Sequence, residues 1–147
     1  MNTLLSVDAK RGQTGVVILE AMIAIFIFSI GILGLVGALS ASVNNASEAQ
    51  YRTEAAFLAD TLIAQMQLAK PTTGLDTRPT DFAYPSGSAY VTWKTRVTTG
   101  ASALPGASLT ANLPTVAFNG NNVTVSIFWL TKNGTTQRQY VVETALE

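Results

Sequence analysis

The sequence predicts an α+β protein in which one long N-terminal helix packs on a small antiparallel sheet of three or four strands. Three observations predict this fold class. An apolar run covers Val16–Leu39, an apolar stripe at helical spacing continues to about residue 70, and alternating apolar residues near the C-terminus indicate strands joined by a tight turn. A sheet packed on the stripe would bury both apolar surfaces.

The apolar run is long enough to cross a bilayer. Its 24 residues contain one charged side chain, Glu20, and one hydroxyl, Ser29. About 20 apolar residues span the hydrocarbon core as a helix, and a helix satisfies its own backbone hydrogen bonds there. A charged residue inside such a segment is costly and therefore rare, so Glu20 is a candidate functional residue.

A basic pair, Lys10 and Arg11, lies just before the apolar run and is followed by a short segment that ends at Gly15. The positive-inside rule places the N-terminus in the cytoplasm and the residues after the run outside. A conventional secretory signal has a shorter apolar region and is cut after it. Residues 38–40 would suit such a cut, but this run is longer and carries a glutamate.

This N-terminal arrangement resembles the class III signal of type IV pilins, which combines a short basic leader, a glycine and an apolar helix with glutamate at its fifth position. The string Phe28–Leu35 resembles more specifically the minor pilins of the PilV type. The resemblance is strong over residues 10–40 and weak beyond residue 70. The family usually begins its mature chain with Phe and then Thr or Ser, whereas this chain has Val16 and Val17.

The resemblance implies cleavage between Gly15 and Val16 by a prepilin peptidase, followed by methylation of the new N-terminus. It implies that Glu20 takes part in assembly by pairing with the new amine of a neighbouring subunit. The implied parts are a cleaved leader (1–15), a transmembrane and assembly helix (16–39), its amphipathic continuation (40–70), and a globular headpiece with a loop and a C-terminal β-hairpin (71–147).

The function expected from the resemblance is that of a structural minor pilin, which takes part in pilus assembly or its initiation. The implied partners are other major and minor pilins, the prepilin peptidase and N-methyltransferase, and the inner-membrane assembly platform. The chain would lie in the inner membrane with its headpiece in the periplasm, and then in the pilus at the cell surface. The close alternative is a minor pseudopilin of a type II secretion system. An alternative of another class is a periplasmic binding module on an uncleaved membrane anchor.

Three glycines, Gly31, Gly34 and Gly37, recur every third residue and spread over one broad face of the helix. Glycine is common in membrane helices generally. Small residues also let helices approach closely, and they let a helix bend or locally melt. The sequence favours neither explanation over the other.

Beyond the apolar run the helical pattern continues to Lys70-Pro71, a cation and a proline that suit the end of a helix. A helix from about 17 to 69 would be roughly 80 Å long. Glu48 and Arg52 are four residues apart with the acid first, which is the favourable order for an ion pair. The apolar stripe comprises Ala55, Leu58, Ala59, Leu62, Met66 and Ala69.

The remaining segments predict a small sheet domain. Residues 71–89 are rich in proline and glycine and predict an irregular surface loop. Residues 90–104 fit both a strand and a helix, and we expect a helix because similar minor pilins have one before a Leu-Pro-Gly, here Leu104–Gly106. A strand is expected at Ser108–Asn112.

The clearest strands lie near the C-terminus. Residues 123–129 alternate with a period of two, and residues 137–145 form the returning strand with Tyr140 and Val142 on one face. Between them, Asn133-Gly134 is the strongest two-residue hairpin signal, and it predicts positive φ at both residues.

The composition argues against an enzyme. The chain has no Cys and no His, which excludes disulfides and thiol chemistry and removes the commonest general base and metal ligand. The acidic residues are scattered, so we expect no catalytic, metal or cofactor site. Lys and Arg total 9, as do Asp and Glu, so no basic excess points to nucleic acid.

Overall fold

The computed structural model describes residues 13–72, 74–132 and 134–147. Lys10, Arg11 and Asn133, which the sequence analysis singled out, lie outside the described residues. The chain divides into two compact units, Met1–Val43 and Asn44–Glu147. The described part of the first unit is helical throughout, and the second unit contains the three strands of the described chain.

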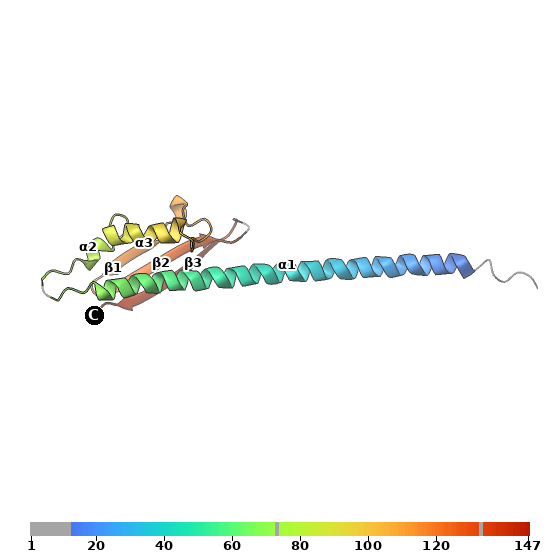
Figure 1. Ribbon diagram of the computed structural model, residues 1–147, viewed down its shortest axis with the longest axis horizontal. Coiled ribbons are helices and arrows are strands. Elements are labelled where there is room, and N and C mark those ends of the chain that lie inside the picture. The colour runs from blue at the N-terminus through green and yellow to red at the C-terminus, as the bar shows by residue number, and fades with distance from the viewer. Residues whose placement is uncertain (1–12, 73, 133) are drawn as a thin grey trace, which may run out of the picture. The chain divides into compact units, whose positions relative to one another are not determined.

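Helix α1, Gln13–Leu68, is the element that both units share (Figure 1). We expected a helix from about residue 17 to 69, and α1 begins inside the expected leader. Its end agrees with the sequence, because Pro71 disfavours helical backbone at the residue before it. The N–H of Ala69 still donates to the carbonyl of Gln65 at 3.0 Å, which closes the last turn.

The second unit has the predicted α+β arrangement, with the amphipathic part of α1 packed on a small antiparallel sheet. The strands are β1 (Thr115–Asn119), β2 (Asn122–Leu130) and β3 (Gln137–Ala145), in the order β1-β2-β3. β2 and β3 lie where the sequence predicted them. In their antiparallel register, Val125 faces Val142 and Leu130 faces Gln137.

The strand expected at Ser108–Asn112 is wrong. Thr110–Asn112 forms a short 3₁₀ helix, η1, and the third strand follows it as β1. The side chain of Asn112 explains the difference, because it is buried and donates to the carbonyl of Gly106 at 3.0 Å. It also accepts from the Gln137 amide at 2.7 Å. The first bond is local and satisfies a backbone carbonyl of the preceding turn, and the second ties η1 to β3.

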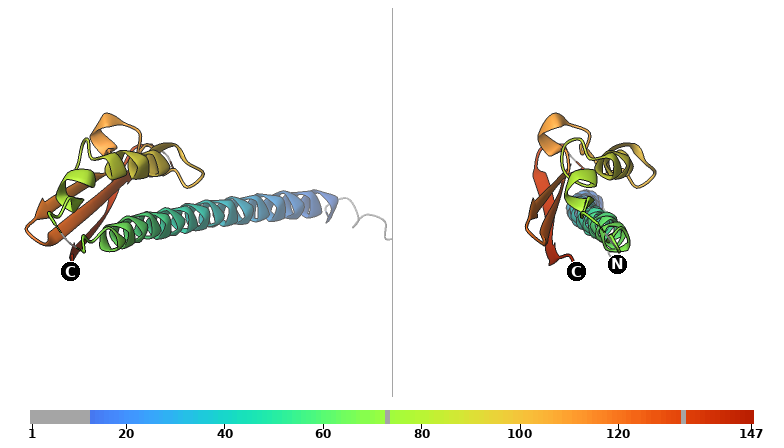
Figure 2. Two further views of the ribbon diagram at one scale, coloured as in Figure 1. Left: turned by 60° about the vertical axis from the view of Figure 1, so that its left-hand side comes forward. Right: turned by 90° about the vertical axis from the view of Figure 1, so that its left-hand side faces the viewer.

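One face of the sheet forms the core of the second unit. Figure 2 shows α3 and the neighbouring part of α1 on the same side of the sheet. The buried residues of β2 alternate, as the period of two predicts; they are Val123, Val125, Ile127 and Trp129. The buried residues of the α1 stripe are Ala55, Leu58, Ala59, Leu62 and Met66. Ala69, which we placed in the same stripe, is exposed and lies beyond the end of α1.

Helix α3, Ser88–Thr99, lies in the segment that fitted both a strand and a helix. Tyr90, Trp93 and Val97 are buried at spacings of three and four, which places them on one helical face. The indole Nε1 of Trp93 donates to the backbone carbonyl of Leu58 at 2.9 Å, and this buried bond ties α3 to α1. The expectation of a helix is therefore confirmed.

The segment 71–89 is less irregular than predicted. It contains the short helix α2, Arg78–Asp81, and the start of α3. Pro79 lies in the first turn of α2, where a missing N–H costs no hydrogen bond, so this proline is compatible with a helix. The guanidinium of Arg78 donates to both carboxylate oxygens of Asp76, the shortest at 2.7 Å, and holds the pKa of Asp76 below its usual value.

The connection between β2 and β3 is longer than the predicted two-residue turn. Leu130 pairs with Gln137, and the N–H of Thr131 donates to the carbonyl of Thr136 at 2.9 Å. The N–H of Gly134 donates to the carbonyl of Thr131 at 2.7 Å, so Gly134 closes a four-residue turn. Its φ of 69° is positive, as expected for the glycine.

Replacing Gly134 with valine should destabilise the hairpin by about 1 kcal/mol or more, because a β-branched residue is strained at positive φ. Space is not the cause, since a Cβ at Gly134 would meet no atom within 4 Å. The measurement is the thermal midpoint of the detergent-solubilised chain. Gly134→Asn is the matched control, because asparagine tolerates this backbone conformation. Equal midpoints for the two variants would contradict the strain argument.

Tyr90 is a buried titratable group in the core. Its hydroxyl donates to the carbonyl of Pro114 at 2.7 Å, and its ring meets that of Tyr84 edge to face at 5.6 Å between centroids. Burial raises the pKa of Tyr90 to about 12, and the neighbouring Tyr84 adds a smaller contribution. The folded chain therefore keeps a proton that the unfolded chain loses at a lower pH.

Stability should accordingly fall as the pH rises from about 10, the ordinary pKa of tyrosine, to about 12. One group contributes at most about 1.4 kcal/mol per pH unit, so about 3 kcal/mol is lost across this window. Denaturant unfolding of the detergent-solubilised chain at several alkaline pH values measures the slope. Tyr90→Phe should flatten it, whereas Tyr84→Phe, at an exposed tyrosine, should leave most of it. A Tyr90→Phe chain with the full slope would show that another group is responsible.

Candidate functional site on the apolar helix

The first unit exposes a continuous apolar surface. Every Val, Ile, Leu, Met and Phe side chain from Val16 to Leu39 is at least 44% exposed. Soluble proteins rarely expose apolar patches of this extent, and such a surface marks contact with a membrane or with other proteins. The segment lies in a helix that is long and apolar enough to cross a membrane. Helix α1 could therefore anchor the chain in a bilayer.

The two polar side chains of the apolar run differ in whether they have a partner within the described chain. The hydroxyl of Ser29 donates to the carbonyl of Ile25 at 2.7 Å, one turn earlier in the same helix. It needs no partner outside the helix. Glu20, by contrast, forms no ion pair with any described residue. In lipid or in a bundle of apolar helices, this carboxylate would need a partner from another molecule.

Glu20 lies in a shallow, mostly apolar groove on the helix surface with a volume of about 450 Å³. Val16 also lines this groove, because residues four apart share one face of a helix. The structure thus brings together Val16 and Glu20, two of the residues that the sequence singled out. The other lining residues are Leu19, Ile23, Ala24 and Ile27.

The predicted processing junction, Gly15-Val16, lies within the first turn of α1. A Cβ placed at Gly15 would meet no atom within 4 Å, so the glycine is not required by packing within the described chain. The basic pair Lys10 and Arg11 belongs to the segment outside the described residues.

The three glycines of the run lie in unbroken helix, so none of them marks a melted segment in this structure. A Cβ at Gly31, Gly34 or Gly37 would also meet no atom within 4 Å. Nothing inside the described chain therefore explains three small residues at this spacing. Close packing against another helix stays a prediction.

Some residues with a clear structural role were missed by the sequence reasoning. Glu48 does not pair with Arg52, as its helical spacing suggested, but with Arg138 on β3, at 3.4 Å between Oε2 and Nε. Trp129, Glu48 and Arg138 line one cleft of the second unit, which is separate from the groove around Glu20. Only the tertiary fold brings Arg138 to the helix, so no local sequence signal could have predicted the contact. Gly134 lies apart from this cleft, in the β2–β3 connection.

Within the part of the chain that the structure describes, no group of three or more acidic, His or Cys side chains is arranged to hold a metal ion. Comparisons with protein-family models, with curated proteins and with solved structures find no match for this chain.

Proposed function

We propose that this chain is a structural minor pilin of a type IV pilus, processed by prepilin peptidase and used in pilus assembly or its initiation. The observation that carries the proposal is an exposed apolar helix with a carboxylate, Glu20, that lies five residues beyond Gly15 and forms no ion pair with any described residue. The helix continues into a small α+β unit, which is the fold class expected for a pilin. The resemblance of residues 10–40 to the class III signal supports the same function.

In this proposal α1 has two successive uses. Before assembly, its apolar part holds the subunit in the inner membrane, with the N-terminus in the cytoplasm and the headpiece in the periplasm. During assembly, the same apolar surface leaves lipid and packs against the helices of other pilins. Either environment removes the exposed apolar side chains of the first unit from water, which is favourable.

In this proposal, the carboxylate of Glu20 sets the axial register in which the helices of neighbouring subunits pack. Removal of the leader would leave a positive amine at Val16, and this amine would also need a partner among apolar helices. Glu20 of one subunit pairs with the Val16 amine of its neighbour in this proposal. A neighbour in a wrong register leaves two charges unpaired, so the pair selects one arrangement even where desolvation cancels much of its attraction.

Processing is the first test. The chain extracted from membranes is expected to begin at Val16, with a methylated amine, and to retain the apolar helix. Intact-mass measurement checks this. A chain beginning near Ala41 would identify a conventional secretory signal, and an intact N-terminus would favour a periplasmic binding module on an uncleaved anchor.

Gly15→Leu should block this processing, because the resemblance implies a small residue at the junction. Gly15→Ala is the matched control and should be processed. Both substitutions leave the described packing undisturbed, since no atom lies near a Cβ at this position. Equal processing of both variants would contradict the assigned junction. A minor pseudopilin would be processed identically, and recovery of the chain in purified pili distinguishes the two assemblies.

A further inference from the structure

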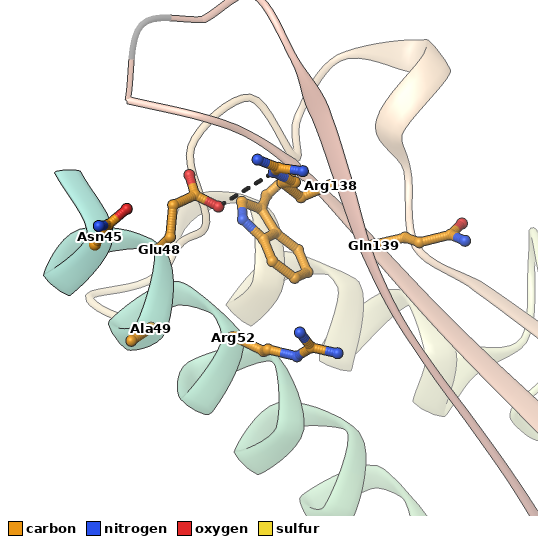
Figure 3. A pocket seen from close by; sticks show the side chains of 7 residues that line it. Asn45, Glu48, Ala49, Arg52, Arg138 and Gln139 are labelled. Carbon is orange, nitrogen blue, oxygen red and sulfur yellow. Dashed lines mark ion pairs between the residues drawn. The ribbon is translucent and has the colours of Figure 1, made fainter. Parts of the chain in front are cut away.

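The second unit contains a cleft between α1 and the β2–β3 hairpin, with a volume of about 430 Å³. Figure 3 shows Glu48 directed toward Arg138 across it, while Arg52 extends from α1 one turn further along. Pockets that bind ligands have volumes of about 300–1,000 Å³, so the cleft can hold a side chain. It is lined by Asn45, Glu48, Ala49, Arg52, Trp129, Arg138 and Gln139.

The charges of the cleft do not balance. Glu48 is its one carboxylate, and it contacts the Nε of Arg138 at the rather long distance of 3.4 Å. Arg52 forms no ion pair with any described residue. The cleft therefore contains two guanidinium groups and one carboxylate, which leaves one positive charge unbalanced and the N–H donors of Arg52 without an acceptor among the described residues.

Trp129 adds a further donor to the lining. Its side chain is 2% exposed, and its Nε1 is enclosed without a hydrogen-bond partner among the described residues. An enclosed N–H without an acceptor is unfavourable. The other tryptophan, Trp93, donates to the Leu58 carbonyl at 2.9 Å. The fold thus leaves a buried N–H donor without an acceptor beside the cleft, in addition to the excess of positive charge within it.

We infer that this cleft receives the carboxylate of an aspartate or glutamate side chain from another subunit, bound by Arg52 and Arg138. This inference rests on the proposed function, since it assumes a neighbouring subunit in an assembly. A planar carboxylate matches the fork of N–H donors that a guanidinium presents. It supplies both the negative charge and the acceptors that the cleft lacks.

The exposure of the cleft favours a carboxylate carried by a protein. The Arg138 side chain is 53% exposed, and an exposed ion pair contributes too little to retain a small free carboxylate. A carboxylate on a subunit that is already held by its own helix acts at a high effective concentration. An anionic membrane surface is a poorer match, because it attracts clusters of four to eight basic residues rather than two.

The test uses the amine of a substituted lysine. The full chain carrying Arg52→Lys is assembled in cells, and the purified filaments are treated with a water-soluble carbodiimide. This reagent activates a carboxylate, and attack by the lysine amine forms an amide while the carbodiimide leaves as a urea. The expected product, identified by mass spectrometry, joins Lys at position 52 to an Asp or Glu of another subunit.

Arg96→Lys is the matched control, because Arg96 is also exposed and forms no ion pair with a described residue. It should give at least about fivefold less cross-linked product. A product formed only with Glu48 of the same chain, with a lipid or with a small carboxylate would overturn the inference, as would equal yields for the two variants.

Charge reversal gives a second measurement. Arg52→Glu should lower the amount of the chain in filaments by roughly tenfold relative to Arg96→Glu, because like charges would then face each other in the cleft. Equal amounts of the two variants would contradict the inference while leaving the proposed function intact. If the unsubstituted chain is absent from filaments, the proposed function itself fails.

Discussion

Replacing Glu20 with alanine should lower the amount of this chain in filaments by about a hundredfold, while its amount in the membrane stays the same. In the proposed assembly, the substitution would leave the Val16 amine of a neighbour without its acid. Leaving one charge of a buried pair unpaired costs about 3 kcal/mol or more, and every 1.4 kcal/mol corresponds to a factor of ten. Membrane insertion should not suffer, because alanine is more easily accommodated in lipid than glutamate.

Two readouts are needed for this experiment: the subunit content of purified filaments and the processed chain in the membrane fraction. Ser29→Ala is the matched control, because it removes the other polar side chain of the apolar run. Its hydroxyl bonds within its own helix, so its loss should change incorporation little. Normal incorporation of the Glu20→Ala chain would show that Glu20 is only a charge near the lipid headgroups.

Replacing Gly87 with alanine should destabilise the second unit by about 2 kcal/mol or more, within the range for overpacked sites. Gly87 is buried immediately before α3, and its carbonyl accepts from the N–H of Val91 at 2.9 Å. A Cβ there would lie 2.7 Å from the carbonyl carbon of Asp81 and 2.9 Å from the nitrogen of Ala83. Both are backbone atoms, so relief requires α2 and α3 to move apart.

The expected loss of unfolding free energy for Gly87→Ala corresponds to a fall in thermal midpoint of roughly 10 °C for a domain of this size. Ser88→Ala, at the exposed neighbouring residue, should change the midpoint by no more than about 2–4 °C, since such surface substitutions are worth about 0.5 kcal/mol. If the two variants melt together, the close approach of Gly87 to the backbone of α2 does not exist in solution.

The sequence predicted elements whose side-chain period is unambiguous. The alternation along β2 and the stripe from Ala55 to Met66 both correspond to buried faces in the structure. Residues 88–99 were harder, because Trp93 and Val97 lie on one face of either a helix or a strand. Periodicity alone does not distinguish a helix from a strand in this segment, and the family resemblance favours the helix.

Turns and loops were predicted less well, for identifiable physical reasons. The two-residue turn joins β1 to β2 at Gly120-Asn121, with a φ of 59° at Gly120. The sequence contains the same Asn-Gly dipeptide at residues 119–120 and at residues 133–134, and only the first adjoins a two-residue connection between strands. The glycine and proline residues around Gly87 predict a loop at this position. Its actual role depends on backbone atoms of α2, which no local pattern reveals.

The residues of the candidate sites show the same contrast between what local sequence predicts and what depends on the tertiary fold. Glu20 could be found from sequence, because a lone carboxylate in an apolar run is conspicuous in composition alone. The pairing of Glu48 with Arg138 could not be found, because the partners are ninety residues apart in the chain and meet only through the fold. The helical spacing of Glu48 and Arg52 suggested another partner, and the tertiary contact prevailed over the local one.

The start of α1 at Gln13 has an electrical consequence for the proposed processing. A cut before Val16 would remove less than one turn and leave the rest of the helix as it is. Aligned peptide dipoles place about half a positive charge at the N-terminal end of a helix, and the new amine would add a whole one. The backbone N–H groups of that end also lack acceptors within the helix. Trimming would thus add a full positive charge to the partial charge of the helix end, and in the proposed assembly a carboxylate from another helix would neutralise both.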